Sequence, residues 1–243
     1  MIPRTALVTG GARRLGAGIV RALAAAGYRV AIHCHTSRAD ADTLAAEIGG
    51  VVVQADLSNE AAVQALLPAA AALIGPIGVL INNASTFERD EWDTATRETW
   101  DHHLDPNLRA PFVLMQALAR DLPPGAEGAV VNLIDQRVWS LTPHFVSYTV
   151  SKAALWALTQ QMALALAPRI RVNGVGPGPA LPSSRQTQAQ FDTMCAALPL
   201  ARGTGPDEVA RAVMAILAMP SMTGQMIALD GGQHLQWGRA FAE

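Results

Sequence analysis

The sequence predicts an α/β protein built on a single Rossmann-type, doubly wound parallel sheet of about seven strands flanked by helices. Short apolar runs alternate with Ala- and Leu-rich stretches of helical period, which is typical of repeated βαβ units. Several early runs lack strict polar–apolar alternation, as expected for strands covered by helices on both faces. A chain of 243 residues, 50% of them apolar, can bury one large core, so we expect one domain over residues 1–243.

The elements are expected in alternating order along the chain. Strands are expected at the short apolar runs Ala6–Val8, Val30–His33, Val51–Gln54, Val79–Ile81, Val130–Ile134, Arg171–Val175 and Ile227–Leu229. Helices are expected at the Ala- and Leu-rich stretches Leu15–Ala26, Ala39–Ile48, Asn59–Leu73, Pro106–Asp121, Tyr148–Leu166 and Pro206–Ala218. The stretch 177–200 contains four prolines and is too long for an ordinary connection. It is interpreted as a substrate-covering segment or as a mobile surface loop.

Composition excludes several classes of function. A net charge of −2 provides no broad basic surface for nucleic acid. No apolar run approaches the roughly 20 residues of a membrane span, and the first strand begins too early to leave room for a signal peptide. Cys34, Cys195 and the histidines show no metal-binding spacing. We therefore expect a cytoplasmic protein with free thiols and no metal, nucleic-acid or membrane site.

Lys152 is the only lysine of the chain and follows Tyr148 by four residues. All 17 other basic side chains apart from histidine are arginines, which indicates that position 152 requires an ammonium group. Residues four apart share one helix face, so a phenol should lie beside a cation. A nearby cation lowers the pKa of a phenol, as proton-transfer catalysis requires. The alternative is a chance pair on a helix.

A glycine-rich stretch from Thr9 to Gly18 joins the first expected strand to the first helix. Glycines allow a tight turn and close approach of a pyrophosphate, which the N-terminus of the helix attracts. A plain tight turn is the alternative interpretation. The pattern favours a dinucleotide site that includes Gly10 and Gly16.

The end of the second strand favours NADPH over NADH. An NAD site usually places a carboxylate there for the ribose 2′-hydroxyl, whereas this segment has none before Asp40. Arg13, Arg14 and Arg38 could hold a 2′-phosphate instead, although a solvated position for Arg38 is as good an interpretation. Asp56 either accepts a bond from the adenine amine or caps the following helix.

The order and spacing of several motifs resemble the short-chain dehydrogenase/reductase family over essentially the whole chain. These are Thr9-Gly10 to Gly16, Asn82-Asn83-Ala84, Asn107, Tyr148-x-x-x-Lys152 and Pro177-Gly178. The resemblance implies a nicotinamide cofactor, a homotetramer, a proton-relay water supported by Asn107, and contact of Lys152 with the nicotinamide ribose. Cofactor binding is thus expected at Gly10, Arg13, Arg14, Leu15, Gly16, His35, Thr36, Ser37, Asp56, Leu57, Asn82, Ala84, Lys152, Pro177 and Gly178.

Two departures from the common family pattern point to its pteridine reductase branch. Arg14 replaces a glycine, and Asp135 replaces the usual serine 13 residues before Tyr148. In that branch the residues matching Arg14 and Ser85 contact the pterin and the cofactor phosphates, and the phenylalanine matching Phe87 stacks on the pterin. By residue type alone, an aromatic after a strand more often packs in the core, and only the place of Phe87 in the Asn-Ala-Ser-Thr-Phe run favours stacking. Arg14 could instead pair with a surface acid.

Two mismatches with the branch concern the pocket. Thr36 stands where an arginine is common, with Arg38 displaced by two residues, and no hydroxyl residue follows Pro177-Gly178 before Ser183. These differences affect the expected phosphate contacts and the pocket shape but not the proton donor.

Asp135 suits a pterin better than a ketone, because an ionised carboxylate repels a developing oxyanion but accepts bonds from ring N–H and amino groups. Its negative charge favours the neutral phenol and so opposes Lys152, and we expect Tyr148 to stay protonated at pH 7. The catalytic set is then Asp135, Tyr148, Lys152 and Asn107, with the substrate contacting Arg14, Ser85, Phe87, Asp135 and Tyr148. A strand-end carboxylate that bonds loop amides is the alternative role of Asp135.

The leading hypothesis is reduction of a dihydropterin, with NADPH as hydride donor to a C=N carbon and Tyr148 as proton donor to the ring nitrogen. A general carbonyl reductase or alcohol dehydrogenase and an NADPH-binding sensor are the alternatives. The helices expected at Pro106–Asp121 and Tyr148–Leu166 are apolar nearly all round, which predicts that they form a dimer interface within a tetramer.

Overall fold

Seven parallel strands form one sheet in the order β3-β2-β1-β4-β5-β6-β7. The computed structural model describes residues 1–183 and 185–235. The strands are β1 (Thr5–Val8), β2 (Arg29–Cys34), β3 (Val51–Gln54), β4 (Val79–Asn82), β5 (Gly128–Leu133), β6 (Ile170–Pro177) and β7 (Met226–Leu229). The predicted fold class is confirmed, and each predicted strand lies within two residues of its observed bounds.

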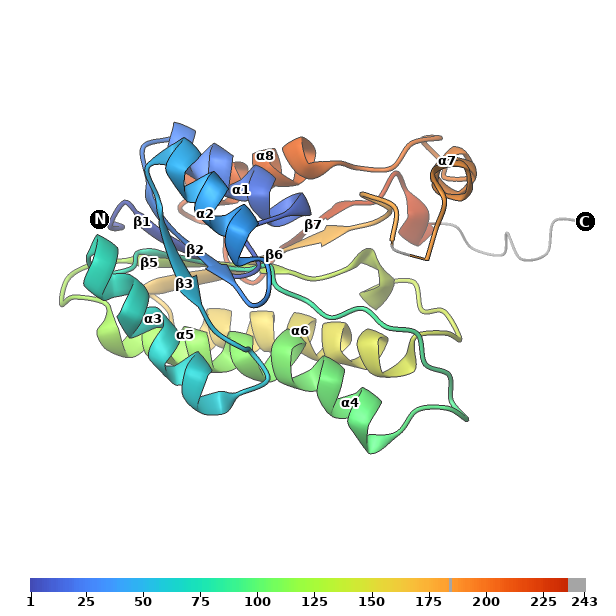
Figure 1. The fold of residues 1–243 in the computed structure, drawn as a ribbon, viewed down its shortest axis with the longest axis horizontal. Helices are drawn as coiled ribbons and strands as arrows, with labels where there is room; N and C mark the ends of the chain where they lie inside the picture. The colour runs from blue at the N-terminus through green and yellow to red at the C-terminus, as the bar shows by residue number, and fades with distance from the viewer. Residues whose placement is uncertain (184, 236–243) are drawn as a thin grey trace, which may run out of the picture.

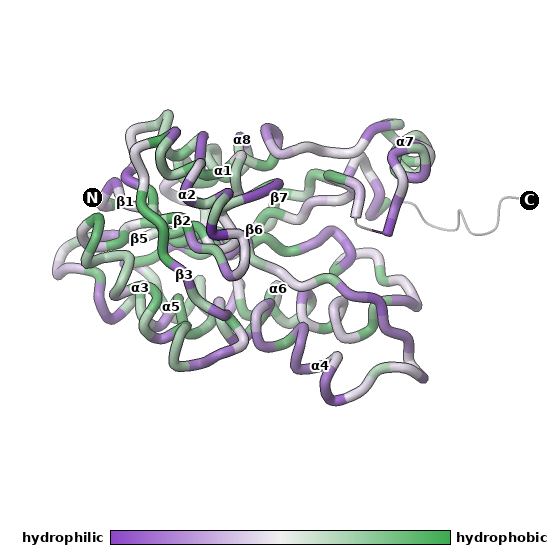
Figure 2. The backbone as a smooth tube through the Cα atoms, viewed as in Figure 1, coloured by the Kyte–Doolittle hydropathy of each residue, from purple (hydrophilic) through white to green (hydrophobic). Residues whose placement is uncertain are grey.

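Helices cover both faces of the sheet (Figure 1). One layer contains α1 (Arg14–Ala25), α2 (Arg38–Ile48) and α8 (Pro206–Ala218), and the other contains α3 (Glu60–Ile74), α4 (Arg97–Leu104), α5 (Ala110–Asp121) and α6 (Val146–Ala165). The pleat of the strands divides the core between these layers. Leu7 packs toward α3 and α5, whereas its neighbours Ala6 and Val8 pack toward α1 and α8. The hydropathy colouring shows the apolar strands between the more polar outer segments (Figure 2).

Three helical segments differ from the expectation. The predicted helix Pro106–Asp121 is the end of a longer helical run that starts at Arg97 and contains a π-helical turn, η1 (Asp105–Arg109). Helix α4 was not predicted, because its sequence is mostly polar. The segment 177–200 was expected to be irregular but contains α7 (Gln188–Ala196), which stands apart from both helix layers at one end of the molecule (Figure 1).

Both unpredicted helices begin with a capping box. Thr96 accepts from the amide of Thr99 and Thr187 accepts from the amide of Gln190, and in each case the third residue bonds back to the cap. These reciprocal bonds satisfy amides that the first turn of a helix leaves free.

Over residues 1–183 and 185–235, no helix has the length and apolar character needed to cross a membrane.

Candidate active site

Two adjoining cavities open where β1, β4 and β5 end. The first, of about 580 Å³, lies over the glycine-rich loop, and the second, of about 600 Å³, lies over Tyr148 and Asp135. Arg14, Leu15 and Ser85 line both cavities. Crevices outside the carboxyl ends of parallel strands are the usual ligand sites of doubly wound sheets. The two cavities therefore have the arrangement expected of a cofactor site and an adjacent substrate site.

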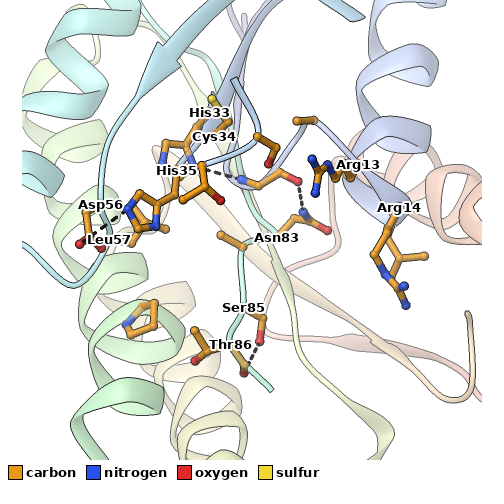
Figure 3. A pocket seen from close by; sticks show the side chains of 18 of the residues that line it. Arg13, Arg14, His33, Cys34, His35, Asp56, Leu57, Asn83, Ser85 and Thr86 are labelled. Carbon is orange, nitrogen blue, oxygen red and sulfur yellow. Dashed lines mark hydrogen bonds and ion pairs between the residues drawn. The ribbon is translucent and has the colours of Figure 1, made fainter. Parts of the chain in front are cut away.

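The glycine-rich loop brings the N-terminus of α1 to the first cavity. Gly10 has a left-handed backbone, with φ of 58°, and a Cβ there would come within 2.9 Å of the Cα of Ala84. Helix α1 has neither a side-chain cap nor an acidic residue in its first turn. Its free N–H groups and dipole therefore favour an anion at this end of the cavity. Arg13 and Arg14 extend along one side of the cavity (Figure 3).

Arg14 has a left-handed backbone, with φ of 52°, although it is not a glycine. Its guanidinium donates to the carbonyl oxygens of Pro182 at 3.1 Å and Leu181 at 3.3 Å. Arg14 thus joins the glycine-rich loop to the segment 177–200 and forms part of both cavities.

His35, Thr36 and Ser37 line the first cavity after β2, as expected of a cofactor site. Arg38 does not line it, because its guanidinium pairs with Asp42, one helical turn away, at 2.8 Å. Arg13 lines the cavity and pairs with Asp40. Of the three arginines considered for a 2′-phosphate, Arg13 and Arg14 line the cavity and Arg38 does not.

Asp56 lies on the opposite side of the first cavity from the arginines, together with Leu57 (Figure 3). Its carboxylate accepts from the amide of Ser58 at 2.9 Å, and this bond is the largest cause of a lowered pKa of Asp56. Asp56 does not cap α3, because Asn59 accepts from the first-turn amide of Ala62 instead. One of the two alternatives drawn from the sequence is therefore wrong.

Asn83, rather than Asn82, faces the first cavity with Ala84. The side chain of Asn82 is buried in the sheet and donates to Asn132 Oδ1 at 2.8 Å. The side-chain amide of Asn83 donates to the carbonyl oxygens of Thr9 at 2.9 Å and Gly10 at 3.0 Å. Asn83 therefore fixes the glycine-rich loop, a function that sequence reasoning did not assign to it.

Tyr148, Asp135 and Lys152 meet in the second cavity. The Tyr148 hydroxyl donates to Asp135 Oδ2 at 2.9 Å, and Asp135 Oδ1 accepts from the backbone amide of Arg137 at 2.8 Å. The carboxylate thus bonds both the phenol and a loop amide. Lys152 Nζ lies 5.9 Å from the centroid of the Tyr148 ring and donates to the carbonyl oxygen of Leu133 at 2.8 Å.

The environment keeps Tyr148 protonated. Burial raises the pKa of Tyr148 well above its ordinary value, and the charge of Asp135 and the hydrogen bond to it raise this pKa further. The direction agrees with the sequence-based expectation, but burial, rather than Asp135, is the largest cause. Burial also lowers the pKa of Lys152 to about 8, against an opposing effect of Asp135. The expected lowering of the phenol pKa by Lys152 is not among the causes; the one lowering contribution comes from Arg137.

Asn107 lies in the π-helical turn η1, and such turns are frequent at functional sites. Its amide exchanges two bonds with the backbone of Thr86, at 2.9 and 3.0 Å, and donates to Ser151 Oγ at 3.1 Å. Asn107 therefore joins the strand-end segment after β4 to α6, beside the proton donor.

An aromatic wall, formed by Phe87 and Phe145, borders the second cavity. The two rings stack with centroids 4.7 Å apart, and Phe87 meets the Tyr148 ring edge-on at 4.6 Å. Phe87 thus lines the cavity rather than the core. Phe145 lies three residues before Tyr148 and was not predicted from the sequence, where an aromatic before a helix had no distinguishing signal.

The segment after β6 contacts this wall through Arg185. Its guanidinium donates to the carbonyl oxygen of Phe87 at 2.9 Å and to the carboxylate of Glu88 at 2.5 Å. Pro177, Gly178 and Ser183 line the second cavity from the same segment. The segment 177–183 and 185–200 therefore forms one side of the cavity in the described part of the chain.

A buried polar network holds the start of α6. Asp90, His103 and Ser147 are each less than 4% exposed. The amide of Glu88 donates to His103 Nε2 at 2.9 Å, so the proton of this ring is on Nδ1, which lies 2.7 Å from Ser147 Oγ. Ser147 Oγ in turn donates to Asp90. Burial lowers the pKa of His103, in agreement with a neutral ring.

Most of the predicted site residues thus gather at the two cavities. The first is lined by Gly10, Arg13, Arg14, Leu15, Gly16, His35, Thr36, Ser37, Asp56, Leu57 and Ala84, and the second by Arg14, Ser85, Phe87, Asp135, Tyr148, Lys152, Pro177 and Gly178. Asn82 and Asn107 are not among the residues that line either cavity. Within the described residues there is no group of three or more His, Cys, Asp or Glu side chains that could hold a metal.

Comparison with known proteins gives close matches over nearly the full chain. A family model described as enoyl-(acyl carrier protein) reductase matches residues 10–234. Pteridine reductase 1 from Leishmania tarentolae is 32% identical over 281 residues, covering 95% of this chain and 96% of its own. L-xylulose reductase from Bos taurus is 37% identical over 240 residues, covering 94% and 96%. The crystal structure of FolM alternative dihydrofolate reductase 1 from Brucella suis, in complex with NADP, matches with a TM-score of 0.94 at 47% identity, covering 97% and 96%.

Proposed function

The chain belongs to the short-chain dehydrogenase/reductase family of oxidoreductases, and from this premise we propose that it reduces a dihydropterin to a tetrahydropterin with NADPH. The observation that carries the proposal is the hydrogen bond of 2.9 Å from Tyr148 to Asp135, a carboxylate where the common family pattern has serine. Similarity to pteridine reductase 1 and to FolM alternative dihydrofolate reductase 1 supports the same substrate class.

The first cavity fits NADPH. The Brucella suis relative binds NADP, and the free amides of the first turn of α1 and the closely packed Gly10 offer this chain an anion site for the pyrophosphate. Arg13 lines this cavity and is the cation that we propose for the 2′-phosphate, which would compete with Asp40 for its guanidinium. When bound, NADPH supplies the hydride for the reduction.

The chain's own residues control the proton. Because the pKa of Tyr148 is raised, its phenol holds a proton for transfer to the ring nitrogen of the substrate. Asp135 accepts a hydrogen bond from that hydroxyl and can also accept hydrogen bonds from N–H groups of a pterin. It would thus hold both the proton donor Tyr148 and the substrate in position. The buried ammonium of Lys152, held by Leu133, lies beside them, where it would bind the nicotinamide ribose. We propose that residues 177–200 cover the substrate and limit the access of water.

The test is NADPH consumption by the purified protein with dihydrobiopterin or dihydromonapterin. Tyr148→Phe should reduce the rate by about 10²- to 10⁴-fold, because it removes the acid but keeps the ring. Asp135→Ser should also reduce pterin turnover. Tyr28→Phe, at the only other tyrosine, is the matched control and should keep the wild-type rate. Pterin turnover that is unchanged in Asp135→Ser would refute the role of Asp135.

A carbonyl reductase is the second candidate. It is favoured by the 37% identity to L-xylulose reductase, which acts on a sugar by its name. Turnover of a ketone such as L-xylulose, with no turnover of any dihydropterin, would establish this alternative over the pterin.

A further inference from the structure

Arg137 is a cation in the second cavity that the proposed reaction does not use. Its guanidinium carbon lies 5.0 Å from the centroid of Phe145, 5.8 Å from that of Tyr148 and 5.9 Å from that of Phe87. Contact with three rings holds the planar group in a fixed position beside the proton donor. The cation is thus oriented by packing rather than by a charged partner.

The hydrogen-bonding capacity of Arg137 is largely unused. Its Nε atom is buried without a hydrogen-bond partner, and its Nη1 atom donates only to Thr142 Oγ1 at 3.2 Å. In the described part of the chain no carboxylate lies within ion-pair distance of it, whereas Arg89 and Arg185 on the same cavity pair with Glu91 and Glu88. A buried guanidinium N–H without an acceptor is costly, and because Nε is closed to solvent, a ligand would bring its acceptor to the Nη atoms.

The charged side chains that line the second cavity are mostly positive, like Arg137 itself. Among the described residues, six charged side chains line it, of which Asp135 is the only acid. The bases are Arg14, Arg89, Arg137, Lys152 and Arg185. Asp135 accepts from the Tyr148 hydroxyl and from the backbone amide of Arg137, but it makes no ion pair with the guanidinium of Arg137. A cavity of about 600 Å³ can hold a bicyclic ring together with a substituent.

We propose that Arg137 forms a subsite for an anionic substituent of the substrate, a carboxylate or a phosphate carried by the pterin. The guanidinium fork matches the oxygen pair of either group. Arg14 donates to Pro182 and Leu181, and Lys152 is assigned to the nicotinamide ribose, which leaves Arg137 as a cation of this cavity with neither an ion pair to the described residues nor an assigned role. The subsite rests on the proposed function, because it assumes that the pterin ring lies between Asp135 and the aromatic wall.

The experiment compares the binding of two pterins that differ in one group, and it requires no turnover. Pterin-6-carboxylate and the neutral 6-hydroxymethylpterin are titrated into the NADP-loaded protein, with pterin fluorescence as the readout. Wild type should bind the carboxylate about tenfold more tightly, as a hydrogen-bonded charge predicts. 6-Hydroxymethylpterin phosphate, as a third arm, shows whether a phosphate or a carboxylate is preferred.

Variants locate the effect. Arg137→Gln should abolish the preference, and Arg137→Lys should keep part of it, because the charge remains but the fork is lost. Arg120→Gln is the matched control: this arginine pairs with its neighbour Asp121 on the surface, so its removal should leave the preference unchanged. If both pterins bind and the ratio of their affinities is the same in wild type and Arg137→Gln, the subsite is wrong. If neither pterin binds the wild type, the substrate class itself fails, and the subsite with it.

Discussion

His33 connects the glycine-rich loop to the end of β3 through both nitrogens of its ring. The amide of Gly10 donates to Nδ1 at 3.1 Å, and Nε2 lies 3.1 Å from the carbonyl oxygen of Ala55. A carbonyl oxygen can only accept, so the proton is on Nε2 and the ring is neutral. Burial lowers the pKa of His33 to about 4. The phosphate-binding loop therefore depends on a histidine that must stay unprotonated.

Because its pKa is lowered by burial, His33 should make the folded protein less stable in acid. The pKa is about 4 in the folded protein and about 6.5 in the unfolded chain, which therefore binds more protons between these values. The free energy of unfolding then falls as the pH drops through this window, by about 3 kcal/mol at pH 4. His33→Gln, which can accept and donate but does not titrate, should lack this component. Denaturant unfolding of both proteins at pH 7 and pH 4 measures it, and an identical loss in both would contradict the assignment.

At the scale of the residue, sequence predicted which side chains meet better than it predicted what they do to one another. Helical spacing placed Lys152 beside Tyr148, and the resemblance to the family placed Asp135 with them. It could not predict that Lys152 bonds the carbonyl of Leu133, or that burial dominates the pKa of the phenol, because both depend on the packing around the group. For Arg38 the solvated position, one of the two alternatives, is the one observed, because Asp42 pairs with it, and Asn82 lies away from the cavity because Asn132 accepts from its side chain.

At the scale of the element, the start of α6 determines the position of the proton donor. Phe145 precedes the helix with a left-handed backbone, with φ of 59°, and provides no side-chain cap. Asp90 replaces the cap from a distant loop: it accepts from the amide of Ser147 at 3.2 Å and from the hydroxyl of the same residue. The loop that carries Phe87 and the helix that carries Tyr148 are thus joined by one carboxylate.

Asp90→Ala should lower the free energy of unfolding by about 1–3 kcal/mol, because two buried donors of Ser147 lose their acceptor. Asp90→Asn should cost less, since the amide oxygen can still accept. The exposed neighbour Asp93 is the matched control, and its replacement by alanine should change stability by no more than about 0.5 kcal/mol. Urea unfolding measures the free energy of unfolding of all three variants. Equal values for Asp90→Ala and Asp93→Ala would show that the buried network does not stabilise the fold.

Helices were predictable where an apolar face packs on the sheet and not where a cap alone defines the element. The bounds of α8 agree with the prediction to the residue, because its apolar spacing is regular and ends in polar segments. Helix α4 buries only His103 and α7 buries none of its residues completely, so neither carries the apolar period that a sequence reading detects. Their Thr96 and Thr187 caps were the available signal.

At the scale of the whole molecule, the two helices expected at a subunit interface differ. The apolar middle of α5 is buried within the subunit, where Val113, Leu114 and Leu118 join the core. Helix α6 leaves Leu164 82% exposed and Val150 40% exposed. Of these two helices, α6 is therefore the one with large apolar side chains left exposed.

We expect a homotetramer, with a mass near four chains of 25.6 kDa by light scattering at micromolar concentration. Leu164→Arg should shift the mass toward smaller species, because it places a charge in the apolar face that the interface buries. Arg at the exposed surface position Gln116, on α5, is the matched control and should leave the mass unchanged. A monomeric wild type would overturn the prediction.

The overall architecture was the most predictable level. Alternating apolar runs and Ala-rich stretches, with a glycine-rich turn after the first strand, were sufficient for a parallel sheet with its ligand site at the strand ends. The division of that site into two cavities was not predictable, because it depends on Arg14 reaching Leu181 and Pro182, more than 160 positions away in the sequence.

The single lysine has a practical consequence. Lys152 is 2% exposed, and its lowered pKa of about 8 leaves much of the amine unprotonated in mildly alkaline buffer. Apart from the α-amino group, Lys152 is therefore the one amine with which an amine-reactive reagent can react. Only an opening of the active site can expose it to the reagent. The rate at which Lys152 is modified measures how often that opening occurs, and its slowing by a bound ligand reports occupancy without any engineered label.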